Sequence, residues 1–337
     1  MINENIFEMQ EQKYALPPEM SGRERDSVNL LVISSNEGTY SSWKFRDMPG
    51  LLPENALLVF NNSMMIPSSF MAYSPELDQF SRLNTGYWKN ELLVEVRNRD
   101  IKPYEGLRFR FVDGSEITLR ETHKNFARYW HAETPAKFER LRESTGEFIS
   151  YSKEFHPMNS GYFMNVFSEI PGSVEYPSAQ RPFTESLLSR AESLGIRTEK
   201  ITLHCNLGSL DASEFWHNTE LLPEYYSVRS ATAETLNRYI EHGRPIIAVG
   251  TTVVRALESS FSHGKFTGSS GFTTRFIEGE LESPLAGIIT GMHDPSTSHL
   301  LMLRAFAPME LIRASYDTAV ELGYGWHEFG DSSLILK

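Results

Sequence analysis

The sequence predicts an α/β protein, with a layered α/β main domain interrupted by an inserted antiparallel β-barrel. After about residue 150, apolar runs typical of strands alternate with amphipathic helices, which indicates a layered α/β domain. Between residues 91 and 120, apolar and polar residues alternate with period two, and Asp113-Gly114 supplies a hairpin turn. The chain of 337 residues has room for both units. We therefore assign residues 1–67 and 151–337 to the main domain and residues 68–150 to the barrel.

The elements of the main domain follow from hydrophobic periodicity and helix stop signals. A buried strand is predicted over residues 56–60, before a polar turn and Pro67, and Gly195 and Gly243 end two helices. The predicted helices span residues 183–194, 233–242, 253–261, 298–306 and 312–322. The further predicted strands span residues 196–205, 245–252, 285–290 and 333–336.

Composition and charge exclude several classes of protein. Hydrophobic residues make up 40% and charged residues 23% of the chain, as in ordinary globular proteins. No signal peptide or membrane-spanning run is recognisable, so we expect a cytoplasmic protein without a membrane partner. The net charge of −12 repels anionic partners unless basic groups gather on one face. The single cysteine, Cys205, excludes an internal disulfide and is expected to be a buried strand residue.

The clearest local signal for ligand binding lies where a buried strand ends at Gly250. Gly250 lets a ligand approach the backbone, Thr251 or Thr252 can cap the following helix, and unpaired amides at a helix start favour an anion. Arg255 and Glu258 fall within the first two helical turns, where they could meet a ligand. An ordinary capped helix with solvent-facing charges explains the same pattern.

Several histidines are placed where proton transfer could occur. His204 follows a strand and precedes a loop with Gly208, at the sheet edge where ligands bind in open α/β sheets. His217 and Glu220 lie three residues apart, and His293 precedes a helix. Histidine suits proton transfer at neutral pH, although a single one more often has a structural hydrogen bond.

Other chemistries have little support. No histidine pair has the helical i, i+4 spacing with a following acid, so we expect no metal. The nucleophile-elbow, phosphate-loop and dinucleotide-binding patterns are absent from the sequence. From the residues alone, we predict an enzyme with a polar cleft that acts on a small molecule, and no feature specifies an oligomeric state.

At these same segments the sequence resembles the S-adenosylmethionine:tRNA ribosyltransferase-isomerase family of queuosine biosynthesis. The resemblance covers nearly the whole chain, in the family's order and at about its spacing. The matching motifs are LLVFNNSMMIP, PGSVEYPSAQRPFTESLL, ITLHCNLGSL, AVGTTVVRALES, ITGMHDPSTSHLLMLRAF and GYGWHEFGD.

The resemblance implies an α/β domain interrupted by a β-barrel and a specific reaction. The ribosyl part of S-adenosylmethionine, the cosubstrate, is transferred to the aminomethyl group of a 7-deazaguanine base in tRNA. An epoxycyclopentanediol forms, and adenine and methionine are released. The reaction needs a base for the proton next to the sulfonium, an acid near adenine and exclusion of water.

The resemblance also implies roles for individual residues. His204, His217 and His293 are the candidate acid/base groups, and Glu220 orients one of them. The adenosyl or methionine end of the cosubstrate is assigned to six residues: Asn61, Gly208, Gly250, Thr251, Thr252 and Arg255.

The chain departs from the family pattern at several charged positions. Met64 and Ser69 stand where the family has arginines, and Pro182 stands where it has a histidine. Gly325 replaces a further arginine of the family pattern, and Arg181, Arg275 or Arg304 are candidates to replace the lost charges in space. Two alternatives therefore stay open beside the tRNA reaction. One is a paralogue that uses S-adenosylmethionine with a small-molecule acceptor or cleaves the sulfonium, and the other is an inactive nucleoside- or RNA-binding protein.

Overall fold

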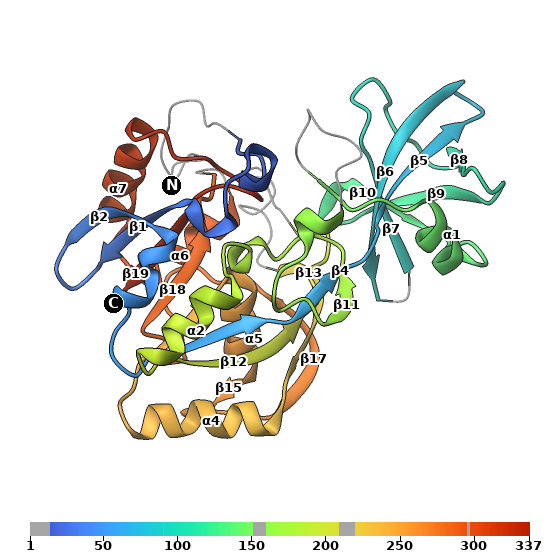
Figure 1. Cartoon of the computed structure of the whole chain (residues 1–337). Coiled ribbons are helices and arrows are strands. Elements are labelled where there is room, and N and C mark those ends of the chain that lie inside the picture. Colours follow the sequence, from blue (N-terminus) through green and yellow to red (C-terminus); the bar gives the residue numbers. More distant parts are fainter. Residues whose placement is uncertain (1–13, 90, 151–159, 209–219, 295–296) are drawn as a thin grey trace.

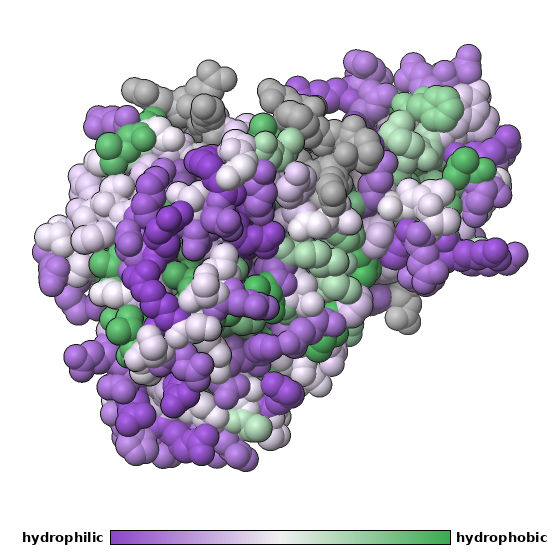
Figure 2. Space-filling view, viewed as in Figure 1, coloured by the Kyte–Doolittle hydropathy of each residue, from purple (hydrophilic) through white to green (hydrophobic). Residues whose placement is uncertain are grey.

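The computed structural model of the protein describes residues 14–89, 91–150, 160–208, 220–294 and 297–337. A larger body built around one sheet and a smaller body built around a barrel lie side by side (Figure 1), and the space-filling view shows them as a larger and a smaller mass (Figure 2). The predicted α/β class with an antiparallel barrel is therefore confirmed. No helix among the described residues is long and apolar enough to cross a membrane.

A mixed sheet of nine strands organises the larger body. Strands β12, β3, β14 and β18 are parallel neighbours, whereas β19 pairs antiparallel with β18. In spatial order the strands are β17 (Ser269–Arg275), β13 (Glu220–Val228), β12 (Arg197–Leu203), β3 (Leu57–Asn61), β14 (Ile246–Val249), β18 (Gly287–Gly291), β19 (Ser332–Leu336), β1 (Asn29–Ser34) and β2 (Thr39–Lys44).

Helices cover both faces of this sheet. Neighbouring residues of β3 alternate between two apolar cores, Leu57 and Val59 in one and Leu58 and Phe60 in the other, so the whole strand is buried. The α-helices of the larger body are α2 (Glu185–Ser193), α4 (Ser230–Glu241), α5 (Thr251–Ser260), α6 (Ser298–Leu303) and α7 (Met309–Glu321). The 3₁₀ turns are η1 (Pro18–Ser21), η2 (Arg25–Ser27), η3 (Phe45–Gly50), η4 (Ser160–Phe163) and η5 (Ser178–Gln180).

The predicted elements of the main domain exist, with shifted ends. The strand predicted over residues 245–252 stops at Val249, and residues 251 and 252 already belong to α5. Helix α4 begins three residues earlier than predicted, at Ser230, and α6 stops three residues earlier, at Leu303. Two short strand pairs complete the body: β4 (Ser63–Met65) with β11 (Ile170–Ser173), and β15 (Phe261–Ser262) with β16 (Lys265–Phe266).

The smaller body is a closed six-stranded barrel with its own apolar core. Its strands in spatial order are β10 (Phe126–Ala132), β7 (Glu91–Val96), β6 (Gln79–Trp88), β5 (Ser69–Ser74), β8 (Arg108–Arg110) and β9 (Glu116–His123). Helix α1 (Phe138–Thr145) packs against this core through Phe138 and Leu141. All of these elements fall within residues 68–150, while the precise domain boundaries stay a prediction.

Because of the directions of the strands, the segments that follow some strands and precede others meet at one edge of the large sheet. The parallel strands β3, β12, β14 and β18 all finish there. Strand β19 runs against β18, and β1 is parallel to β19, so both of these strands begin at the same edge. Segments from distant parts of the sequence therefore meet there, as expected for ligand sites in α/β sheets.

Candidate functional site

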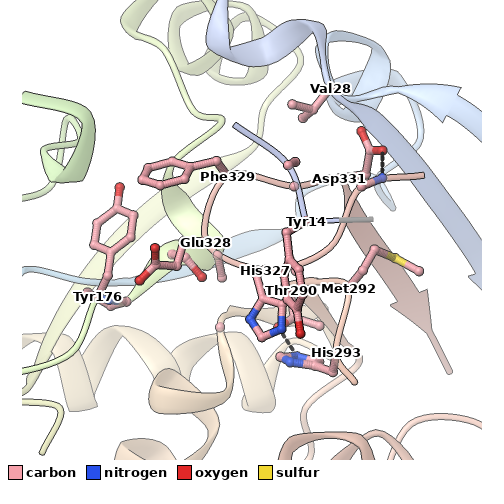
Figure 3. A pocket seen from close by; sticks show the side chains of 18 of the residues that line it. Tyr14, Val28, Tyr176, Thr290, Met292, His293, His327, Glu328, Phe329 and Asp331 are labelled. Atoms are coloured by element: carbon pink, nitrogen blue, oxygen red, sulfur yellow. Dashed lines mark hydrogen bonds between the residues drawn. The ribbon is translucent and has the colours of Figure 1, made fainter. Parts of the chain in front are cut away.

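A cavity of about 1280 Å³ lies at this edge, between the sheet and the barrel. It exceeds the roughly 300–1,000 Å³ of ordinary small-molecule sites, so more than one reactant fits. Residues after β12, β14 and β18 line it, together with residues before β19 and β1. The close-up shows side chains from these segments turned toward one another around Tyr14, His293 and His327 (Figure 3).

The Gly250 motif lies in this cavity, as predicted from its place at a strand end. Gly250, Thr251, Thr252 and Arg255 all line the space. Gly250 is the residue before α5 and has φ 102° and ψ 151°, a backbone conformation that side-chain-bearing residues rarely adopt. No side chain caps the helix, so the predicted threonine cap is wrong: both threonines are already helical. The N–H groups of Val253 and Val254 donate to the Gly250 carbonyl, so the amides that this helix start offers to the cavity are those of Thr251 and Thr252.

Arg255 does not face solvent, because it forms an ion pair with Glu224 of β13. The side chains are 6% and 2% exposed, respectively, and Glu224 also accepts a hydrogen bond from the Asn206 backbone N–H at 3.1 Å. Burial raises the pKa of Glu224, and the Arg255 charge opposes that rise. Glu258, one turn further along α5, instead accepts bonds from the backbone N–H groups of Glu282 and Ser283 and does not line the cavity.

His293 lines the cavity and has a histidine neighbour that the sequence analysis did not assign. Its Nε2 lies 2.8 Å from Thr290 Oγ1, and its ring centroid lies 5.1 Å from that of His299. Burial lowers the pKa of His293 well below its usual value and that of His299 to about 4. Both rings are therefore neutral at pH 7.

A histidine–carboxylate pair completes this wall. His327 Nε2 lies 2.7 Å from Asp294 Oδ2, and the Tyr14 ring lies 4.3 Å from the imidazole. His327 has a positive φ of 67°, which non-glycine residues adopt at an energetic cost and which recurs at functional sites. The carboxylate fixes the orientation and tautomer of the ring. The pair was missed because its members are 33 residues apart.

His204 lies outside the cavity. Its Nδ1 is 2.7 Å from Ser63 Oγ, its ring is stacked near Tyr225 at 5.7 Å, and it fills the space above Gly172. Cys205, the next residue, lines the cavity instead, because successive side chains of an extended chain point to opposite sides. Cys205 is buried, as expected, and burial raises the pKa of its thiol to about 12, but the expectation of a strand residue is wrong, because β12 ends two residues earlier, at Leu203.

Asn61 is also outside the cavity and is fully buried. Its side-chain oxygen accepts hydrogen bonds from the backbone N–H groups of Ser63 and Leu203, and its Nδ2 donates to the Leu203 carbonyl. These contacts tie the end of β3 to β12, which is a structural role. Gly208 does line the cavity. His217 lies outside the described residues. For Glu220, only the position of the backbone, at the start of β13, is described.

The arginines predicted to replace the lost family charges are engaged elsewhere. Arg181 is buried against Glu19 at 2.7 Å, Arg275 bonds Glu282 at 2.7 Å, and Arg304 pairs with Glu278 at 3.2 Å. None of the three lines the cavity. Among the described residues, no cluster of three or more His, Cys, Asp or Glu side chains has an arrangement that could hold a metal ion.

Comparison with known proteins places the chain in a family. The family model described as "Queuosine biosynthesis protein" matches residues 3–335. A relative from Thermus thermophilus, an S-adenosylmethionine:tRNA ribosyltransferase-isomerase, is 30% identical over 348 residues, covering 96% of this chain and 98% of the relative. A relative of the same name from Treponema denticola is 29% identical and covers all of both chains.

The architecture also has a solved counterpart. The crystal structure of an S-adenosylmethionine tRNA ribosyltransferase from Thermotoga maritima aligns with a TM-score of 0.52 over 97% of this chain and 100% of that one, at 23% identity. At that identity the likeness concerns the fold. Because the family model spans nearly the entire sequence and the relatives align from end to end, the chain belongs to the queuosine biosynthesis protein family.

Proposed function

We propose that this protein transfers and isomerises the ribosyl group of S-adenosylmethionine onto a 7-aminomethyl-7-deazaguanine base of tRNA. The product would be epoxyqueuosine, with adenine and methionine released. The observation that carries the proposal is the joint cavity, in which the Gly250 motif and His293 meet side chains from the barrel. End-to-end relationship to enzymes named for this reaction supports it.

The electrostatics of the cavity suit a sulfonium nucleoside. Besides Glu224, which is paired with Arg255, the space is bordered by the carboxylates of Glu175, Asp294, Glu328 and Asp331. Figure 3 shows Glu328 beside Tyr176 and Phe329. Opposite charge attracts a sulfonium cation, whereas protonated histidines would repel it. The low pKa values of His293 and His299 keep these two rings neutral at neutral pH, so this wall does not repel the cation.

The residues around the Gly250 motif would hold the cosubstrate. The amides at the start of α5 can donate hydrogen bonds to an anionic or polar group, such as the methionine carboxylate or a ribose hydroxyl. Gly250, Thr251 and Thr252 line the cavity beside these amides. Arg255, held by Glu224, contributes a buried positive charge.

Proton transfer is assigned to the histidines that line the cavity, which are His293, His299 and His327. The positive sulfur stabilises the carbanion that forms when a base accepts the proton of the neighbouring ribose carbon. We assign that base to His327, which Asp294 positions, with His293 as the second proton-transfer candidate. His204 is assigned a structural role, because Ser63, Gly172 and Tyr225 enclose it.

Incubation with adenine-labelled S-adenosylmethionine tests the function. The proposal requires adenine release that depends on tRNA carrying the aminomethyl deazaguanine. Release without tRNA would support the paralogue with a small-molecule acceptor or a sulfonium-cleaving enzyme. Binding without release would support an inactive binding protein.

A further inference from the structure

Three arginines of the barrel face the same cavity. Arg97 directly follows β7, Arg99 lies two residues further, and Arg128 belongs to β10. Strands β7 and β10 are paired, with Glu95 opposite Tyr129, so Arg97 and Arg128 come from neighbouring positions on adjacent strands. The barrel thus places a basic cluster on a cavity whose other walls carry both carboxylates and the cations of Arg23, Lys44 and Arg255.

A single glutamate holds two members of this cluster in place. Glu95 Oε1 lies 3.0 Å from Arg97 Nη1 and 4.0 Å from Arg128 Nη1, and Asn84 Nδ2 donates to the other Glu95 oxygen at 3.2 Å. The Glu95 side chain is only 11% exposed, whereas that of Arg97 is 42% exposed. Arg97 therefore shares a buried carboxylate with a second arginine and presents part of its guanidinium group to the cavity.

Arg108 and Arg110 of the barrel also pair with carboxylates but do not line the cavity. Arg108 Nε lies 2.6 Å from Glu76 Oε1, and Arg110 Nε lies 2.7 Å from Glu116 Oε1, so each bonds a carboxylate on the barrel surface away from the cavity. Among the residues that the structure describes, no carboxylate lies within ion-pair distance of Arg99. On the cavity side, three guanidinium groups, those of Arg97, Arg99 and Arg128, are offset by the single Glu95 carboxylate among the described residues, so this side of the barrel keeps a net positive charge.

We infer that Arg97 and Arg99, with Arg128 beside them, form a phosphate-binding subsite that grips the RNA backbone next to the acceptor base. The inference rests on the proposed function. Guanidinium groups bind phosphates through paired N–H donors, and such contacts fix the position of a nucleic acid without reading its sequence. The whole chain has a net charge of −12 and therefore repels RNA phosphates at long range, whereas this local cluster attracts them at short range. The barrel then acts as the acceptor-binding body, and the sheet edge holds the cosubstrate.

The salt dependence of RNA binding tests the subsite. Each lost contact with a phosphate of a single strand lowers the slope of log K against log salt by about 0.7. The double variant Arg97→Ala/Arg99→Ala should therefore bind a tRNA transcript with a slope smaller by about 1.4, measured by fluorescence anisotropy between about 50 and 200 mM salt. The matched control Arg108→Ala/Arg110→Ala should keep the wild-type slope. Calorimetry with S-adenosylhomocysteine should give the same affinity for all three proteins.

The outcomes separate this inference from the proposed function. A wild-type slope in Arg97→Ala/Arg99→Ala, with the transcript still bound, overturns the subsite and leaves the tRNA reaction standing. Weaker binding of S-adenosylhomocysteine by that variant would assign the cluster to the cosubstrate and likewise overturn the subsite. Absence of transcript binding by the wild-type protein would remove the tRNA acceptor, and the subsite with it.

Discussion

Arg255 of α5 and Glu224 of β13 form an ion pair that is almost fully buried at the wall of the cavity. The contact joins the helix after the Gly250 motif to an antiparallel strand of the large sheet. Burying two charges is costly, and the pair is favourable only while both partners are present. The pair therefore links the stability of the fold to the geometry of the site.

Removal of one partner should cost more stability than removal of both. Glu224→Ala leaves the Arg255 charge buried and should lower the free energy of unfolding by about 3–5 kcal/mol. The double variant Glu224→Leu/Arg255→Met should regain most of that loss but bind S-adenosylmethionine more weakly. Urea unfolding of the three proteins measures the difference. Equal stabilities of Glu224→Ala and wild type would refute the coupling.

Asp294 should act on catalysis through His327. Asp294→Asn keeps the side-chain size but removes the charge that orients the imidazole at 2.7 Å. We expect kcat to fall about 100-fold or more, with nearly unchanged affinity for S-adenosylmethionine. Glu278→Gln, on a carboxylate paired with Arg304 and outside the cavity, is the control. An unchanged kcat in Asp294→Asn would remove the Asp294–His327 pair from proton transfer.

His204 should matter to stability more than to turnover. His204→Ala removes the bond to Ser63 and leaves a void beside Gly172, which should lower the free energy of unfolding by about 1–3 kcal/mol. Its kcat should stay within about tenfold of wild type, since general acid–base groups contribute about 100-fold or more. Steady-state kinetics at a temperature where the variant is folded provides the check. A folded His204→Ala protein without turnover would restore the catalytic assignment.

Stability should fall as the pH drops from neutral. Burial lowers the pKa of His299 from 6.5 to about 4, so between these values the unfolded chain takes up a proton that the folded chain excludes. The folded state is then favoured above pH 6.5 and loses stability as the pH approaches 4. In His299→Gln, the loss of free energy of unfolding between pH 7.5 and pH 5 should be smaller than in the wild-type protein by roughly 1–2 kcal/mol. Urea unfolding of both proteins at the two pH values measures the difference. An equal loss of free energy of unfolding in His299→Gln and wild type would contradict the role of His299.

The sequence predicted those parts of the site that depend on local signals. The strand before Gly250, the helix after it and the position of His293 after a strand all follow from hydrophobic runs and glycine positions. These residues lie in the cavity because parallel strands end at one edge. Strand β2 was missed for a physical reason: every residue in it is exposed, so it has no apolar alternation to detect.

The remainder of the site depends on contacts that no local pattern contains. His204 and Cys205 are neighbours at a strand end, and only the packed structure shows that the cysteine, and not the histidine, faces the cavity. In the sequence, Glu224 is one polar residue among the polar and apolar residues of a strand. Its role becomes evident only from the ion pair with Arg255 in the structure. The barrel arginines join the site only because an inserted body folds back beside the sheet edge.

The central claim is that one cavity brings S-adenosylmethionine and the deazaguanine base of a tRNA together. Its most direct test is the release of labelled adenine by the wild-type protein, with and without tRNA that carries the aminomethyl deazaguanine. The account predicts release only with this tRNA, at a rate that Asp294→Asn lowers. Equal release with and without the tRNA, or no release in its presence, would contradict it.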